Sequence, residues 1–163
     1  MSSVIFPYTV SFFGHRIVTD SIFVAEYLEQ VIIQLLREKE YVEFLVGRNG
    51  DFDQLVSSAI RKIKKNFRND NSSHVLVLAY PTSEFQKNEQ SFYDYYDEIE
   101  ICEAAAQSHF KSAIKIRNRS MVDRSDLVVC YIKHESGGAY QAVSYAKRQS
   151  KKVLNVAHEI FTN

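Results

Sequence analysis

Two short, uninterrupted apolar runs constrain the fold of this chain more than any other feature. Residues 74–80 read HVLVLAY and residues 126–131 read DLVVCY, and both runs are rich in β-branched side chains. A strand that is apolar at every position is buried on both faces, which is typical of a parallel sheet covered by helices. The sequence therefore predicts a buried central sheet in an α/β protein.

Other segments with strand character alternate with amphipathic helical patterns. The expected strands are Tyr8–Phe13, Glu43–Val46, His74–Ala79, Leu127–Tyr131 and Lys152–Val156, with a weaker sixth around Glu98–Cys102. The expected helices are 21–39, 51–67 with Asp51 as N-cap, 108–120 and 138–149. This alternation predicts a three-layer α/β fold with a mostly parallel sheet of about five strands flanked by helices. The polar and aromatic stretch 81–97 is expected to be a long loop or a lid.

Composition favours one domain over residues 1–163 and argues against several functions. The chain is 45% hydrophobic, and its 20 Lys and Arg balance its 20 Asp and Glu. Proteins that rely on a broad basic surface have an excess of Lys and Arg, so we expect no nucleic acid polymer as partner. We find no signal peptide and no apolar stretch of bilayer length, and therefore expect a cytoplasmic protein without a membrane partner. Cys102 and Cys130 lack metal-ligand spacing and are expected to be buried thiols.

All five glycines lie between a predicted strand and the helix that follows it. They are Gly14, Gly47, Gly50, Gly137 and Gly138. In a parallel sheet these strand ends share the carboxyl edge, where open α/β sheets bind ligands. Glycine allows the backbone to approach a ligand, and the following helix N-terminus favours phosphate. We therefore expect a ligand site at this edge.

Polar residues beside the first glycine have two readings of equal weight. Arg16 could hold a phosphate or carboxylate, and His15 could donate a hydrogen bond or shuttle a proton. Alternatively, Arg16 pairs with a local acid such as Asp20, and His15 satisfies a backbone carbonyl. Asp53 follows Gly50 by three residues. It either lies in the first turn of a helix, where its negative charge interacts favourably with the helix dipole, or contacts a ribose hydroxyl.

Arg117 and Asn118 are further candidates for ligand contacts, in a charged segment that otherwise reads as surface salt bridges and caps. The histidines show no ligand spacing, so no metal site is expected. The glycines match neither a dinucleotide fingerprint nor a P-loop, so no cofactor is expected beyond a bound nucleotide.

Four motifs, in order, resemble the SLOG superfamily. They are FFGHR (12–16), VGRNGDFDQLV (46–56), RNRSMVDRSDLVVCY (117–131) and SGGAYQAVSYAKR (136–148). These are Rossmann-like domains related to the lonely-guy phosphoribohydrolases, and the most similar branch is a group of small, poorly characterised bacterial proteins. The resemblance implies a nucleotide-derived ligand that contacts Gly14, His15, Arg16 and residues 47–53, with Gly137 and Gly138 around a phosphate.

The last motif departs from the enzyme branch. The proline, third glycine, threonine and glutamate of that branch are missing here, and Ala139 stands where the bacterial branch has Thr. These departures favour a non-catalytic sensor that binds a nucleotide-like small molecule. The alternatives are a nucleoside-5'-monophosphate phosphoribohydrolase, with unassigned catalytic residues, and an interaction protein. The resemblance also implies a homo-oligomer, since relatives form dimers.

Overall fold

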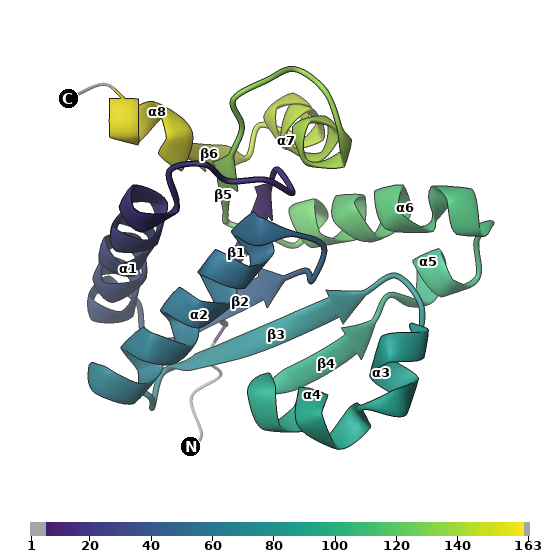
Figure 1. Cartoon of the computed structure of the whole chain (residues 1–163), viewed down its shortest axis with the longest axis horizontal. Helices are drawn as coiled ribbons and strands as arrows, with labels where there is room; N and C mark the ends of the chain where they lie inside the picture. Colours follow the sequence, from purple (N-terminus) through teal and green to yellow (C-terminus); the bar gives the residue numbers. More distant parts are fainter. Residues whose placement is uncertain (1–5, 162–163) are drawn as a thin grey trace.

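The structure is a computed structural model that describes residues 6–161 (Figure 1). The strands are β1 (Tyr8–Gly14), β2 (Val42–Val46), β3 (Ser72–Leu78), β4 (Glu98–Ile101), β5 (Leu127–Tyr131) and β6 (Lys152–Asn155). The longer helices are α1 (Ser21–Glu38), α2 (Asp51–Asn66), α6 (Phe110–Asp123) and α7 (Gly138–Arg148). The shorter ones are α3 (Ser83–Lys87), α4 (Glu89–Tyr95), α5 (Glu103–Ala106) and α8 (Val156–Phe161).

The strands form one six-stranded sheet in which every neighbouring pair is parallel. The strand order is β4-β3-β2-β1-β5-β6. Every residue of β3 and β5 is buried, so the two apolar runs form interior strands with helices on both faces. The predicted three-layer Rossmann-like α/β fold is confirmed, and the weakest expected strand, β4, forms one edge of the sheet.

Helices cover the two faces of the sheet with separate apolar cores (Figure 1). On one face, α1, α2 and α8 bury side chains such as Leu28, Ile60 and Val156 against Phe12 and Phe44 of the strands. On the other face, α6 and α7 pack in a second core that also contains the free thiol of Cys130. Within the described residues, no helix has the length and apolarity needed to cross a membrane.

The direction in which strands are added to the sheet reverses between β1 and β5. The chain adds β2, β3 and β4 on one side of β1, and then adds β5 and β6 on the other. Gly14 at the end of β1 pairs with Tyr131 at the end of β5. The chain then enters α1 on one face and α7 on the opposite face, so the two loops diverge. Open α/β sheets bind ligands at such a switch point.

The stretch Pro81–Asp97 is helical, and the prediction of a long loop or lid is wrong. It forms α3 and α4. Phe85 of α3 and Phe92 of α4 are both buried, and their ring centroids lie 5.4 Å apart. Tyr96 is also buried and accepts a hydrogen bond from Arg48, whose guanidinium lies over the Phe92 ring. The aromatic residues of this stretch are spaced so that Phe85, Phe92 and Tyr96 are buried together, and their apolar surface packs the segment against the core.

The N-terminus of α2 also differs from the expectation that Asp51 is its N-cap. Gly50 occupies the cap position, and Asp51 is the first helical residue. The Asp51 carboxylate accepts a hydrogen bond from the Val18 N–H at 3.0 Å, while its own N–H donates to the Arg16 carbonyl at 2.8 Å. Asp51 therefore fastens the loop after β1 to α2 and leaves the helix end without a side-chain cap.

Candidate functional site

A cavity of about 370 Å³ lies at the switch point between the ends of β1 and β5. Its walls come from the loops after both strands, the first turn of α7 and one face of α6. The predicted ligand residues that line it are Gly14, His15, Arg16, Asp53, Arg117, Asn118, Gly137, Gly138 and Ala139. Gly47, Gly50 and Asp51 are not among the lining residues. The fold thus gathers residues from all four sequence motifs, of which the second contributes Asn49 and Asp53.

Arg117 brings a buried positive charge into this cavity. The residue is 5% exposed, and its Nε donates to the Val77 carbonyl at 2.8 Å while Nη1 donates to Asn118 Oδ1 at 2.7 Å. No described carboxylate forms an ion pair with it. Burial lowers the pKa of Arg117, and the charge of nearby Asp53 opposes that change. A desolvated guanidinium without an ion-pair partner is a strong binding group for an anion.

Asp53 is the one carboxylate among the residues that line the cavity. It accepts a hydrogen bond from the Asn49 N–H at 2.8 Å. Burial raises the pKa of Asp53, while this hydrogen bond and the charge of Arg117 act in the opposite direction. Asp53 therefore organises the loop after β2 and partly balances Arg117.

His15 and His134 form a stacked pair at the cavity wall. Their ring centroids lie 3.7 Å apart with an interplanar angle of 3°. His15 Nε2 accepts a hydrogen bond from the Lys133 N–H at 2.9 Å, so the neutral ring carries its proton on Nδ1. Burial and the charge of His134 both lower the pKa of His15. His15 therefore joins the two diverging loops as a hydrogen-bond acceptor, whereas one reading of the sequence expected it to satisfy a backbone carbonyl.

The side chain of Arg16 is exposed and extends beside the cavity without an ion pair to any described residue. Its expected partner, Asp20, instead accepts a hydrogen bond from Tyr131 at 2.6 Å and pairs with Lys133 at 3.4 Å. The reading in which Arg16 pairs with Asp20 is therefore wrong. Arg16 remains available to a ligand.

The first turn of α7 points into the same cavity. Gly137 is the N-cap residue with a φ of 95°, and no side chain caps the helix. A β-carbon added at Gly137 or Gly138 would meet nothing within 4 Å. The unpaired N–H groups at a helix N-terminus carry partial positive charge and suit an anion. Together with Arg117, they give the cavity two independent anion-binding elements.

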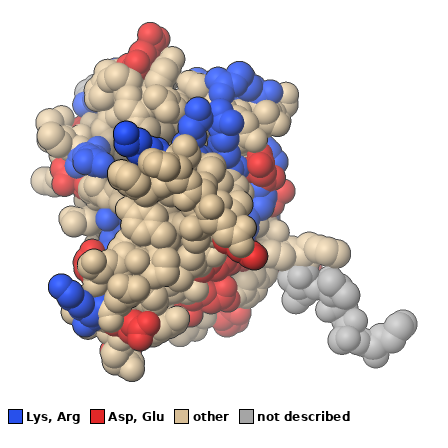
Figure 2. Space-filling view, turned by 90° about the vertical axis from the view of Figure 1, so that its right-hand side faces the viewer, with Lys and Arg blue, Asp and Glu red and all other residues tan. Residues whose placement is uncertain are grey.

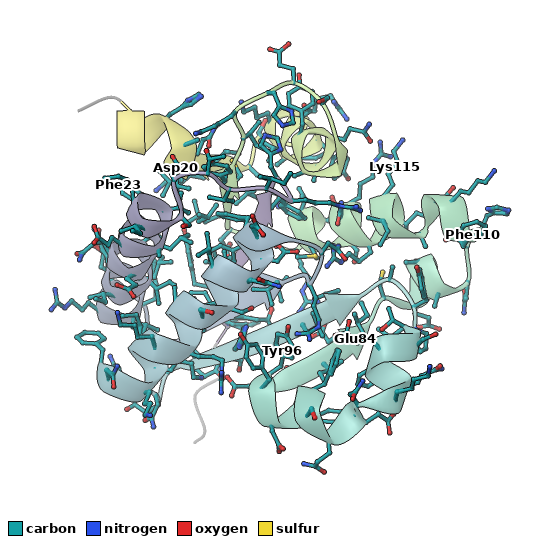
Figure 3. All side chains as sticks on the ribbon, viewed as in Figure 1. Asp20, Phe23, Glu84, Tyr96, Phe110 and Lys115 are labelled. Carbon is teal, nitrogen blue, oxygen red and sulfur yellow. The ribbon has the colours of Figure 1, made fainter. Side chains whose placement is uncertain are left out.

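A second cavity of about 590 Å³ adjoins the first between α6 and α7, and we call it the α6–α7 groove. The two cavities share Ile114, Asn118 and Gly138. The cationic side chains that line the groove are Lys111, Lys115, Arg119 and Arg148. Figure 2 shows Lys and Arg gathered across the upper part of this side of the molecule, and Figure 3 shows Lys115 above α6 on the side of α7.

Sequence reasoning missed this groove, although a signal for it is present. Lys111, Lys115 and Arg119 recur every fourth residue in a predicted helix, and this spacing places them on one stripe. Sequence reasoning also missed His134, which has no motif that would mark it as a partner of His15.

A group of three carboxylates lies outside both cavities. One oxygen atom from each of Glu43, Glu98 and Glu100 lies within 4.8 Å of the others. Arg124 forms ion pairs with Glu43 at 2.8 Å and with Glu100 at 2.6 Å. The guanidinium already supplies positive charge there, in agreement with the expectation that the charged segment 117–126 forms surface salt bridges.

Comparison with known proteins gives a relationship of fold alone. No protein-family model matches the sequence, and no curated protein matches it. DNA processing protein A (DprA) from Streptococcus pneumoniae aligns with a TM-score of 0.63 and 18% identity, over 91% of this chain and 49% of that protein. DprA from Helicobacter pylori, whose structure is described for its single-stranded DNA binding mode, aligns with a TM-score of 0.60 and 15% identity. That alignment covers 90% of this chain and 64% of the neighbour.

These neighbours overturn the functional prediction made from the sequence. A small nucleotide-like ligand, held by a sensor or cleaved by a phosphoribohydrolase, was expected, and a nucleic acid polymer was excluded. The finding that the same fold serves a single-stranded DNA-binding protein contradicts both expectations. The exclusion rested on a net charge of zero, but net charge averages over the whole surface and conceals the cations gathered on α6 and α7. This chain has the Rossmann-like fold of the DprA proteins. It spans about half the length of the Streptococcus pneumoniae protein and about two thirds of the length of the Helicobacter pylori protein.

Proposed function

We propose that this chain binds single-stranded nucleic acid at the carboxyl edge of its sheet, with a backbone phosphate in the switch-point cavity. The observation that carries the proposal is Arg117, a buried cation that lines the cavity and forms no ion pair with a described carboxylate. The fold shared with a single-stranded DNA-binding protein supports the choice of polymer. The order of the four sequence motifs supports membership of the SLOG superfamily, and the bacterial branch stays a prediction.

The geometry of the cavity favours a phosphate over an uncharged group. Arg117 uses Nε and Nη1 within the protein, which leaves donors on Nη2 for a ligand oxygen. The first turn of α7 offers backbone N–H groups on the other side, beside the open space at Gly137 and Gly138. Arg16 adds an exposed cation at the rim. Phosphate contacts of this kind dominate the affinity of nucleic acid binding and are independent of sequence.

The test is fluorescence anisotropy with a labelled oligothymidine and with a duplex of equal length, over a range of salt concentrations. We expect the wild-type protein to bind the single strand more tightly, and the affinity to fall as salt rises because bound counterions are released. Arg117→Met removes a charged hydrogen-bond donor and is expected to weaken binding by about 10- to 100-fold. Arg16→Met is expected to weaken binding less, because that side chain is exposed.

Arg37→Met is the matched control, since Arg37 is an exposed arginine of α1 that lines neither cavity. It loses the same charge and is expected to bind like the wild type. If Arg117→Met fails to fold, as judged by circular dichroism, the comparison of Arg16→Met with Arg37→Met still decides the case. Absence of binding by the wild type at low salt, or equal binding by all three variants, would refute the proposal.

A further inference from the structure

We infer that the α6–α7 groove is a second stretch of the same binding site, which holds phosphates of a strand that continues out of the switch-point cavity. This inference rests on the proposed function and adds the path and the length of the bound strand.

The charge of the groove is one-sided. Its lining residues include four cations, Lys111, Lys115, Arg119 and Arg148, and no Asp or Glu. None of these four side chains forms an ion pair with a described residue. Four cations with no acidic residue among the lining residues produce a local positive field, although the net charge of the whole chain is zero. Such a field complements a polyanion.

The four cations are ordered along the groove. Lys111, Lys115 and Arg119 are each four residues apart on α6, which is a rise of about 6 Å per step. Arg148 faces them from the end of α7, and the Arg119 and Arg148 guanidinium groups lie 4.9 Å and 6.0 Å from the centroid of the same Tyr145 ring. A row of regularly spaced charges fits the regular phosphates of an extended strand better than it fits a single compact anion.

The groove is continuous with the switch-point cavity. Ile114, Asn118 and Gly138 line both, so a strand leaving Arg117 passes directly between α6 and α7. Asn118 accepts the hydrogen bond from Arg117 on the cavity side. Tyr140 lines the groove from α7 and offers a ring for base contact, which is sequence-tolerant in single-stranded nucleic acid binding.

The test compares a short oligothymidine of about 2 nucleotides, which can occupy the cavity without extending along the groove, with one of about 20 nucleotides, which also fills the groove. The double variant Lys115→Gln/Arg148→Gln removes two groove charges and leaves the cavity intact. For the long oligonucleotide we expect at least a tenfold loss of affinity, and a decrease of about 1.4 in the slope of log affinity against log salt, because each phosphate contact contributes about 0.7. Affinity for the short oligonucleotide is expected to stay unchanged.

The control is Lys65→Gln/Lys87→Gln, which removes two exposed lysines of α2 and α3 that line neither cavity. It should bind both oligonucleotides like the wild type. If the groove variant matches this control on the long oligonucleotide while the wild type binds both, the groove inference is overturned and the proposed function stands. If the wild type binds neither oligonucleotide at low salt, the proposed function itself has failed.

Discussion

A β-carbon at Gly47 would lie closer than 3.0 Å to Nη2 of Arg117, nearer than real β-carbons approach another heavy atom. Gly47 is the first residue after β2, is buried, and is not among the residues that line the switch-point cavity. It nevertheless determines the position of the residue that carries the proposed function. The absence of a side chain at Gly47 leaves the space through which the Arg117 guanidinium reaches the cavity beside Asp53.

Replacing Gly47 with alanine is therefore expected to displace Arg117 and to lower both stability and binding. Overpacking of a buried site of this kind costs about 1–3 kcal/mol in the free energy of unfolding, which urea denaturation measures. Binding of oligothymidine should fall as it does for Arg117→Met. Gly138→Ala, whose β-carbon would meet nothing within 4 Å, is the control for stability. Unchanged stability and binding for Gly47→Ala would contradict the idea that the space at Gly47 determines the position of the Arg117 guanidinium.

The two glycines at the start of α7 are expected to respond differently to alanine. Gly137 has a φ of 95°, a conformation that L side chains rarely adopt, whereas Gly138 has no such constraint. Gly137→Ala should therefore cost about 1 kcal/mol of unfolding free energy, and Gly138→Ala should be neutral or slightly stabilising. Equal thermal midpoints for the two variants would contradict this assignment.

Stability is expected to fall in mild acid because of His74 on β3. Its burial lowers the pKa to about 4 from 6.5, despite the opposing charge of Asp97. As pH falls below 6.5, the unfolded chain takes up the proton first, so stability is full above pH 6.5 and is lost progressively toward pH 4. Between pH 7 and about pH 4.5 the loss from this residue is about 2 kcal/mol.

Urea denaturation at both pH values of the double variant His74→Leu/Ser57→Ala isolates this contribution. Ser57 is changed as well because its hydroxyl is hydrogen bonded to His74 Nε2 at 2.9 Å. The double variant should lose about 2 kcal/mol less than the wild type on acidification. His109→Asn, at an exposed histidine, should keep the wild-type dependence, and an unchanged dependence in the double variant would contradict the role of His74.

His15 is expected to remain neutral at pH values where an ordinary histidine is protonated. Its pKa is lowered below 6.5 by burial and by the charge of His134, and protonation would remove the Nε2 acceptor that holds the Lys133 N–H. NMR titration of the ring nitrogens should therefore give a midpoint below 6.5, with Nδ1 protonated in the neutral form. His134→Ala should raise that midpoint. A midpoint above 6.5, or one insensitive to His134, would argue against this pairing.

The fold could be predicted to a large extent because burial on both faces leaves a direct trace in sequence. Strands β3 and β5 are uninterrupted apolar runs, and α2 shows one apolar face from Phe52 to Ile63. The short helices α3 and α4 left no such trace, because a helix of five or seven residues is too short to show a period.

The sequence by itself determined the sheet, the four longer helices that flank it and the edge at which glycines and polar residues meet. Only the tertiary structure decided which of those residues face a common cavity. Gly47, Gly50 and Asp51 serve packing and loop attachment, while Arg117 reaches the cavity from a helix far along the chain. Only the tertiary structure also revealed the α6–α7 groove, because net charge is a sum over the chain, whereas a ligand responds to charges that are close in space.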